Sequence, residues 1–151
     1  MKATIAIASD HAGFVLKEKL KAYLLRSGFN PRDLGAYSKE RTDYPPFAYI
    51  LSRGIASGRF KRGIIICKSG IGMSIVANRV PGVRAALCYN VKAAKLSREH
   101  NDSNVLVLGS GFVDAGLARR ITGIWLKTKF VGGRHKRRLG LLKGIEKEIK
   151  G

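Results

Sequence analysis

The chain has 151 residues, of which 45% are hydrophobic, and it carries a formal net charge of +19. This length fits one domain, residues 1–151. Because no apolar run approaches the ~20 residues that span a bilayer and the amino terminus has no secretory signal, we expect a cytoplasmic protein without a membrane partner.

Strand and helix signals alternate along the whole chain. In chain order, we expect a strand at Thr4–Ser9, a helix at Gly13–Ser27, a strand at Phe29–Leu34, a helix at Tyr44–Ser57, a strand at Gly63–Cys67, a helix from near Met73, a strand at Val83–Leu87, a helix at Val91–Glu99, a strand at Val105–Leu108, and helices at Ala115–Lys127 and His135–Lys150. This order predicts a single doubly wound α/β domain with a five-stranded parallel sheet and helices on both faces. The last helix has no strand behind it, so we expect it to pack on a partner subunit.

Polar residues follow several of the predicted strands, at the sheet edge where ligands bind in such folds. They are Asp10-His11, Cys67 to Gly72, Cys88-Tyr89-Asn90 and Gly109-Ser110-Gly111. The predicted site therefore lies at the carboxyl ends of the strands.

The loop from Ser69 to Gly72 follows a buried strand and precedes a helix, so its amides can converge on an anion. It lacks the sequence of a nucleotide-hydrolase loop or a dinucleotide fingerprint, and alone it is equally typical of a plain turn. Cys67 lies beside these amides and the cation of Lys68, where a thiol ionises more readily than a free cysteine. The alternative is a buried structural cysteine, as Cys88 can be.

Other candidate residues are open to two interpretations each. Asp10 and His11 can exchange protons with a sugar, or Asp10 can cap the following helix. The run His100-Asn101-Asp102 can be a polar cluster or a solvated turn. Arg134 and Arg138 are four residues apart and share a helix face that can hold a phosphate, although such charge runs are usually solvated. The histidines and carboxylates show no metal-ligand spacing.

Several motifs together resemble the type B ribose-5-phosphate isomerases, over nearly the whole chain. The matching stretches are Ser9–Phe14, Thr42–Pro45, Ile66–Ile75, Ala77-Asn78, Ser97–Asp102 and Gly132–His135. The resemblance implies interconversion of ribose 5-phosphate and ribulose 5-phosphate through an enediol or enediolate, without a metal or organic cofactor.

The resemblance also implies residue roles. Cys67 is the base that moves a proton from C2 to C1, the Ser69 to Gly72 loop stabilises the charge on oxygen, and His100 with Asp10 opens the furanose ring. The implied substrate contacts are Asp10, His11, Tyr44, Lys68, Ser69, Gly70, Ile71, Gly72, Asn101, Arg134 and Arg138. In the family the site lies between two subunits, so we expect a homodimer or a dimer of dimers in which His100 and Asn101 face the partner's Cys67.

Four positions distinguish this chain within that resemblance. Met73 stands where relatives without the cysteine carry a glutamate base, which assigns the chain to the cysteine branch. Lys68 and Ser69 replace a common glycine and a common threonine, and Ser69 keeps the hydroxyl. Gly111 occupies a position often held by an arginine that aids phosphate binding from the partner subunit, so we expect a neighbouring basic residue or the general positive field to compensate.

Two alternatives remain for the function. The first is a six-carbon substrate, such as allose 6-phosphate or galactose 6-phosphate. The second is nucleic-acid binding, which the +19 charge and eight basic residues within residues 129–151 favour. Because the sequence has no aromatic-interleaved basic stripe, we expect no specific nucleic-acid partner.

Overall fold

The computed structural model describes residues 2–151. Its elements are β1 (Thr4–Ser9), α1 (Phe14–Arg26), β2 (Asn30–Asp33), α2 (Pro45–Ala56), β3 (Gly63–Cys67), α3 (Ile71–Ala77), β4 (Ala85–Leu87), α4 (Val91–Asn101), β5 (Val105–Gly109), α5 (Ala115–Lys127) and α6 (Arg134–Lys150). All strand pairs are parallel, in the order β2-β1-β3-β5-β4. The predicted five-stranded parallel sheet is confirmed.

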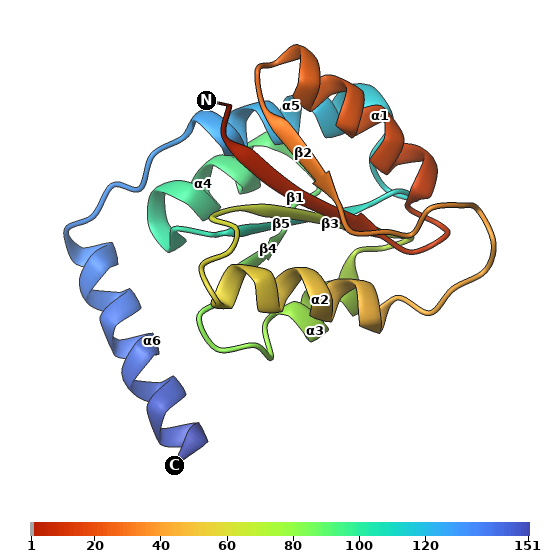
Figure 1. Cartoon of the computed structure of the whole chain (residues 1–151). Helices are drawn as coiled ribbons and strands as arrows, with labels where there is room; N and C mark the ends of the chain where they lie inside the picture. Colours follow the sequence, from red (N-terminus) through yellow and green to blue (C-terminus); the bar gives the residue numbers. More distant parts are fainter. Residues whose placement is uncertain (1) are drawn as a thin grey trace.

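Two helical layers cover the sheet, with α1, α4 and α5 on one face and α2 and α3 on the other (Figure 1). The alternation along β3 shows why both faces are apolar: Ile64 and Ile66 join the core under α1 and α5, whereas Ile65 and Cys67 join the core over α2 and α3. Burying each such aliphatic side chain contributes roughly 1.5–3 kcal/mol. The continuous apolar run of β3 is therefore the signature of a central strand.

The strand order reverses between β1 and β3. From β1 the chain crosses through α1 to β2 on one side, and it then returns through α2 to β3 on the other side. The carboxyl ends of these two neighbouring strands diverge into helices on opposite faces, which opens a crevice there. Asp10 follows β1 at this crevice, and Cys67 is the last residue of β3.

Most predicted boundaries agree with the structure within two residues, and the differences have local causes. The helix expected near Met73 begins at Ile71 because Gly70 takes a left-handed conformation (φ +83°) that starts the helix directly after the loop. The strand expected from Val83 begins at Ala85, since the amide of Val83 donates to Val80 in a turn. The helix α4 continues to Asn101 and ends at Asp102, which has a left-handed conformation. His100 and Asn101 are therefore helical, and the turn expected over residues 100–102 is wrong for these two residues.

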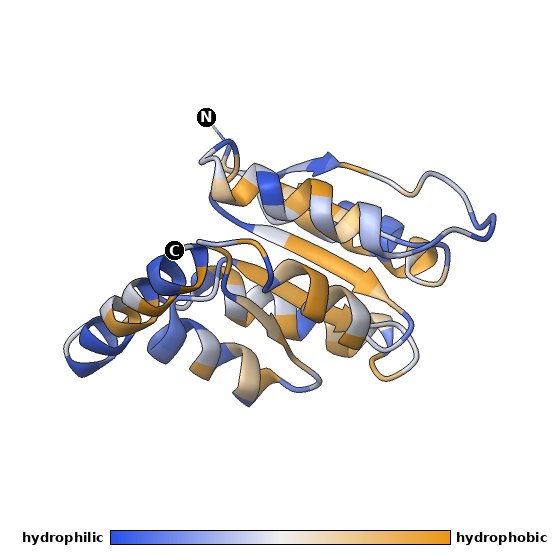
Figure 2. Cartoon of the chain, turned by 90° about the horizontal axis from the view of Figure 1, so that it is seen from below, coloured by the Kyte–Doolittle hydropathy of each residue, from blue (hydrophilic) through white to orange (hydrophobic). Residues whose placement is uncertain are grey.

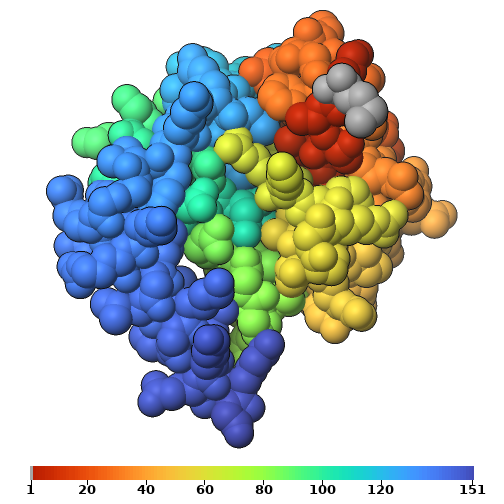
Figure 3. Space-filling view, turned by 60° about the vertical axis from the view of Figure 1, so that its left-hand side comes forward, coloured from red at the N-terminus to blue at the C-terminus, as the bar shows by residue number. Residues whose placement is uncertain are grey.

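Helix α6 stands apart from the two layers (Figures 1 and 3). It follows the extended segment 128–133, and among its residues only His135 is buried. Hydrophobic residues alternate with hydrophilic ones along it, as Figure 2 shows, and Leu141, Ile145 and Ile149 are exposed by 60%, 51% and 81%. Much of the apolar surface of this helix is therefore not covered by its own chain.

Candidate active site

The carboxyl edge of the sheet brings together the expected residues from the first half of the chain. They come from the segments after β1 and β3 and from the loop before α2: Asp10, His11, Tyr44, Cys67, Lys68, Ser69, Gly70, Ile71 and Gly72. Direct contacts between these segments, described below, fix them around Cys67.

Cys67 ends β3 with its side chain 5% exposed, and its sulfur receives a hydrogen bond from the loop that follows. The amide of Gly70 donates to Cys67 Sγ at 3.2 Å. A second amide of the loop, that of Ile71, donates to Ser69 Oγ at 3.1 Å. Two amides of the loop thus point at the side chains of Cys67 and Ser69.

Cys88 provides the contrast. It is 1% exposed within the apolar core under α4 and α5. Burial raises the pKa of its thiol to about 11, against a smaller lowering by the Ser97 hydroxyl. It stays protonated at neutral pH, so the structural interpretation holds for Cys88.

Close backbone approaches shape the loop after Cys67. A Cβ on Gly109, at the end of β5, would lie 2.4 Å from the carbonyl oxygen of Ser69, and one on Gly72 would lie 2.5 Å from the ring of Tyr44. These glycines let the loop pack against β5 on one side and let the phenol of Tyr44 lie over it on the other. The phenol of Tyr89 holds the same Ser69 carbonyl at 2.7 Å.

Hydrogen bonds to neighbouring loops fix the positions of Asp10 and His11. The carboxylate of Asp10, 6% exposed, accepts the amide of Gly13 at 3.1 Å. Gly13 is itself the N-cap of α1, which has no side-chain cap, so Asp10 holds the turn before the helix and does not cap the helix. His11 Nδ1 lies 3.1 Å from the carbonyl oxygen and 3.2 Å from the amide nitrogen of Thr42. Because Thr42 occupies Nδ1, Nε2 is the ring nitrogen that can meet a ligand.

A buried ion pair stabilises the loop next to the end of β1. Lys17, fully buried on α1, donates to both carboxylate oxygens of Asp33 at 2.7 and 2.6 Å. Burial alone would raise the pKa of Asp33, but the hydrogen bonds from Lys17, Lys21 and the Gly35 amide lower it overall. The carbonyl oxygen of Gly35 in turn accepts a hydrogen bond from the amide of Ser9 at 2.7 Å. The ion pair of Lys17 and Asp33 therefore stabilises the loop at Gly35, which contacts the end of β1.

Two of the distinguishing positions touch each other. A Cβ on Gly111 would lie 3.0 Å from Cε and 3.1 Å from the carbonyl oxygen of Lys68. The aliphatic stem of Lys68 thus occupies the space next to Gly111, and its exposed ammonium lines a cavity of about 390 Å³ together with Lys19 and Ser110. The neighbouring basic residue expected near Gly111 is present.

The remaining expected residues lie at the other end of the sheet. His100 and Asn101 end α4, and Asp102 beyond them bonds to Arg84, which precedes β4. Arg134 opens α6 and Arg138 follows it by one turn. Within one chain the fold therefore separates these side chains from Cys67 by the length of the strands.

The amino edge has its own organisation. The rings of His100 and His135 stack with centroids 4.2 Å apart and planes inclined by 11°. The pKa of His135 is lowered, first by desolvation and then by the positive charges of His100, Arg134 and Arg138. The stack ties α6 to the end of α4 and groups the basic side chains of α6 beside His100.

Two residues with a role in this arrangement were missed by the sequence reasoning. Thr42 orients His11, and Tyr89 fixes the Ser69 carbonyl while stacking on Phe112 at 4.9 Å. The position of Tyr89 after a strand was a signal for the edge itself. Neither contact follows from sequence spacing, since each joins segments that are distant along the chain.

Within residues 2–151, three or more His, Cys, Asp or Glu side chains nowhere gather as metal ligands would. Over the same range, the helices are too short or too polar to cross a bilayer.

Comparison with known proteins assigns the family. Residues 5–142 match the family model described as Ribose/Galactose Isomerase. The chain belongs to this family. Ribose-5-phosphate isomerase B of Escherichia coli (strain K12) is 44% identical over 142 residues, which cover 94% of this chain and 95% of that protein.

Solved structures of family members have the same fold. Ribose-5-phosphate isomerase B of Clostridium thermocellum superposes with a TM-score of 0.95 at 45% identity, covering 97% of this chain and 99% of that one. The enzyme of Mycoplasma genitalium, solved with bound ribulose 5-phosphate, gives a TM-score of 0.92 at 41% identity, covering 98% and 99%. The predicted family and fold class are thus confirmed.

Proposed function

We propose that this chain interconverts ribose 5-phosphate and ribulose 5-phosphate, with Cys67 as the base. The observation that carries the proposal is the hydrogen bond from the Gly70 amide to Cys67 Sγ, in a loop at the crevice between β1 and β3. Family membership and the ribulose 5-phosphate bound to the Mycoplasma genitalium relative support the substrate class.

The chemistry begins with the closed sugar. His100 and Asp10 transfer the protons that open the furanose ring, which frees the aldehyde at C1. The Cys67 thiolate then takes the proton from C2, and the C–H electrons form the C1–C2 double bond of an enediolate with its charge on O1. The thiol returns the proton to C1, while O1 receives a proton and O2 gives one up. The ketose therefore forms with no net change in the number of protons on the sugar.

The charge on O1 needs stabilisation during the transfer. Amides of the Ser69 to Gly72 loop are the available donors, and the hydroxyl of Ser69 lies among them. Such preorganised donors contribute about 2.7–4 kcal/mol each to related reactions. This chemistry uses only side chains and backbone groups of the protein.

A homodimer, alone or paired into a tetramer, would complete the site. His100, Asn101, Arg134 and Arg138 are at the edge opposite to Cys67, so they act on substrate only if they belong to a second subunit. The exposed apolar residues of α6 supply a reason for association, because their burial against a partner removes them from water. In that dimer His11 of one protomer and the two arginines of the other hold the phosphate.

Lys68 takes a substrate-binding role in this proposal. Its stem fills the space that Gly111 leaves, and the residue lines a cavity at the carboxyl edge together with Lys19 and Ser110. It supplies a cation for the phosphorylated sugar close to the position where many relatives carry an arginine.

The two cysteines support a cytoplasmic location. Both Cys67 and Cys88 are free and buried, and unpaired thiols are typical of a reducing compartment. We therefore place the enzyme in the cytoplasm.

Kinetics of two cysteine variants test the function. Cys67→Ala is expected to abolish conversion of ribose 5-phosphate, by at least ~100-fold, while the circular dichroism spectrum stays unchanged. Cys88→Ala is the matched control, since that thiol lies in the core and not in the crevice. Normal turnover by Cys67→Ala would refute the assignment, and faster turnover of allose 6-phosphate than of ribose 5-phosphate by the wild type would move the proposal to six-carbon substrates.

A further inference from the structure

A second cavity, at the amino edge of the sheet, is lined by basic side chains that the isomerase reaction does not use. It has a volume of about 380 Å³, and its charged lining residues are Lys61, Arg62, Arg84, Arg98 and Asp102. Lys61 and Arg62 immediately precede β3, Arg84 precedes β4, and Arg98 belongs to α4. The cavity therefore lies where three elements meet, a strand length away from Cys67.

The positive charges in this cavity exceed the negative ones. Asp102 is its single carboxylate, and it is shared, with Oδ1 2.9 Å from Arg98 Nη1 and Oδ2 3.5 Å from Arg84 Nη2. Arg62 instead donates to the carbonyl oxygens of Trp125 and Leu126, which carry no full charge. Within the described residues, 2–151, neither Lys61 nor Arg62 has an ion-pair partner.

Burial makes this imbalance costly. Arg98 is 5% exposed, and Arg62 is half-buried with its guanidinium 5.4 Å from the ring of Trp125. The pKa of Arg62 is lowered mainly by desolvation and, to a smaller extent, by the positive charge of Arg98. Cations that repel one another in a partly desolvated cavity are stabilised by an anion that enters it.

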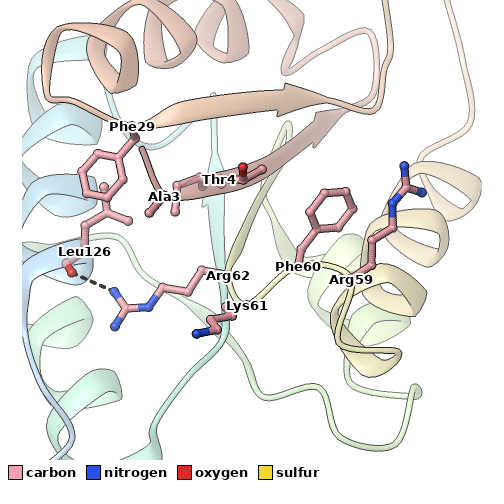
Figure 4. A pocket seen from close by; sticks show the side chains of 9 residues that line it. Ala3, Thr4, Phe29, Arg59, Phe60, Lys61, Arg62 and Leu126 are labelled. Atoms are coloured by element: carbon pink, nitrogen blue, oxygen red, sulfur yellow. Dashed lines mark hydrogen bonds between the residues drawn. The ribbon is translucent and has the colours of Figure 1, made fainter. Parts of the chain in front are cut away.

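An apolar cavity adjoins the basic one and shares Phe60, Lys61 and Arg62 with it. Its volume is about 420 Å³, and Phe29 and Leu126 are among the other residues that line it (Figure 4). Figure 4 shows Arg62 extending toward the Leu126 carbonyl, with Phe29 at one end of the cavity and Phe60 at the other. A ligand with one anionic and one apolar part can therefore contact both cavities across Arg62.

We propose that the amino edge is a second ligand site, which binds an aromatic phosphate ester such as a nucleotide. The phosphate lies in the cavity of Lys61, Arg62 and Arg84, where guanidinium groups match phosphate oxygens in pairs. The ring lies in the adjoining cavity, against Phe29. Within one chain the site lies a strand length away from Cys67, and its binding of a ligand does not use the isomerase chemistry.

Isothermal titration of the full chain with ADP, and in parallel with inorganic pyrophosphate, tests this site. One ADP per chain is expected to bind, more tightly than pyrophosphate, and equally well to the Cys67→Ala variant. No saturable binding of ADP would overturn the proposal, and so would equal affinity for pyrophosphate, because the apolar cavity would then contribute nothing. Loss of binding in Cys67→Ala would likewise overturn it, by moving the ligand to the isomerase site.

Charge variants locate the bound ligand. Arg84→Gln is expected to weaken ADP binding about tenfold, the usual effect of losing a charge-assisted hydrogen bond. Arg53→Gln removes the same charge from the exposed face of α2 and is the matched control. Because Arg84 also bonds to the backbone of Asp102, Lys61→Gln serves as a second variant on an exposed residue. Equal weakening by Arg53→Gln would contradict a local site and indicate the general positive field.

Discussion

Replacement of Gly109 by alanine tests whether the loop after Cys67 must lie where it does. The added Cβ would be 2.4 Å from the carbonyl oxygen and 2.6 Å from the carbonyl carbon of Ser69, whereas ordinary contacts begin at 3.4 Å. Both atoms belong to the backbone, so the loop has to shift by roughly 1 Å. The shift also breaks or strains the hydrogen bond of 2.7 Å from the Tyr89 phenol to that carbonyl.

The expected consequences of Gly109→Ala differ for stability and for activity. Overpacking a well-packed site costs about 1–3 kcal/mol of unfolding free energy, measured by urea denaturation. A misplacement of ~1 Å in the catalytic loop is expected to lower kcat for ribose 5-phosphate about 100-fold. Gly116→Ala, whose nearest contact would be 3.5 Å, is the matched control. If both variants have the same kcat, the close approach at Gly109 does not position the catalytic loop.

Three further predictions concern charges and thiols. Lys68→Gly is expected to raise KM for ribose 5-phosphate about tenfold through loss of a cation, and Gly111→Arg in the same background to restore part of it; an unchanged KM in Lys68→Gly would remove Lys68 from the substrate site. Iodoacetamide at neutral pH is expected to modify Cys67 and to spare Cys88, whose pKa of about 11 keeps it protonated; peptide mass spectrometry showing Cys88 modified first would contradict this order. Burial lowers the pKa of His135 in the folded state, so folding favours the neutral ring. The contribution of His135 to the free energy of unfolding is therefore complete above the unfolded pKa of about 6.5. It is lost as the pH falls from that value toward the lower pKa of the folded state. Urea midpoints of wild type and His135→Gln should therefore converge on acidification, and a constant difference between them would be inconsistent with the lowered pKa.

The fold was largely predictable because its signals are local. The apolar run of β3 and the alternation of strands with amphipathic helices depend on neighbouring residues, and both survive in the structure. Boundaries were less predictable where a backbone conformation decides them, as at Gly70, whose left-handed conformation starts α3. The extent of α4 was underestimated, since Asp102 closes it in a conformation that is uncommon for a residue other than glycine.

The candidate site was predictable in composition but not in contacts. Residues that follow strands were expected at one edge, and Asp10 and Cys67 lie there. The contact of Lys68 with Gly111 and that of Thr42 with His11 join segments that sequence patterns do not relate. Physical proximity of this kind depends on how the loops after different strands pack, which becomes visible only in three dimensions.

The exposed apolar residues of α6 explain why one chain looks incomplete. The exposed apolar residues of α6 and the position of His100 at the edge opposite to Cys67 both point to a second subunit. This is the central claim of the proposed function: the catalytic cysteine and the catalytic histidine act together only across two chains.

Activity of mixed dimers tests that claim most directly. The variants Cys67→Ala and His100→Asn are each expected to be inactive alone. When they are coexpressed in equal amounts, half of the dimers contain one chain of each kind, and one of the two sites in such a dimer has both Cys67 and His100 intact. The account predicts about a quarter of the wild-type specific activity with ribose 5-phosphate. Activity no higher than that of the separate variants, in a preparation shown by mass spectrometry to contain mixed dimers, would contradict it.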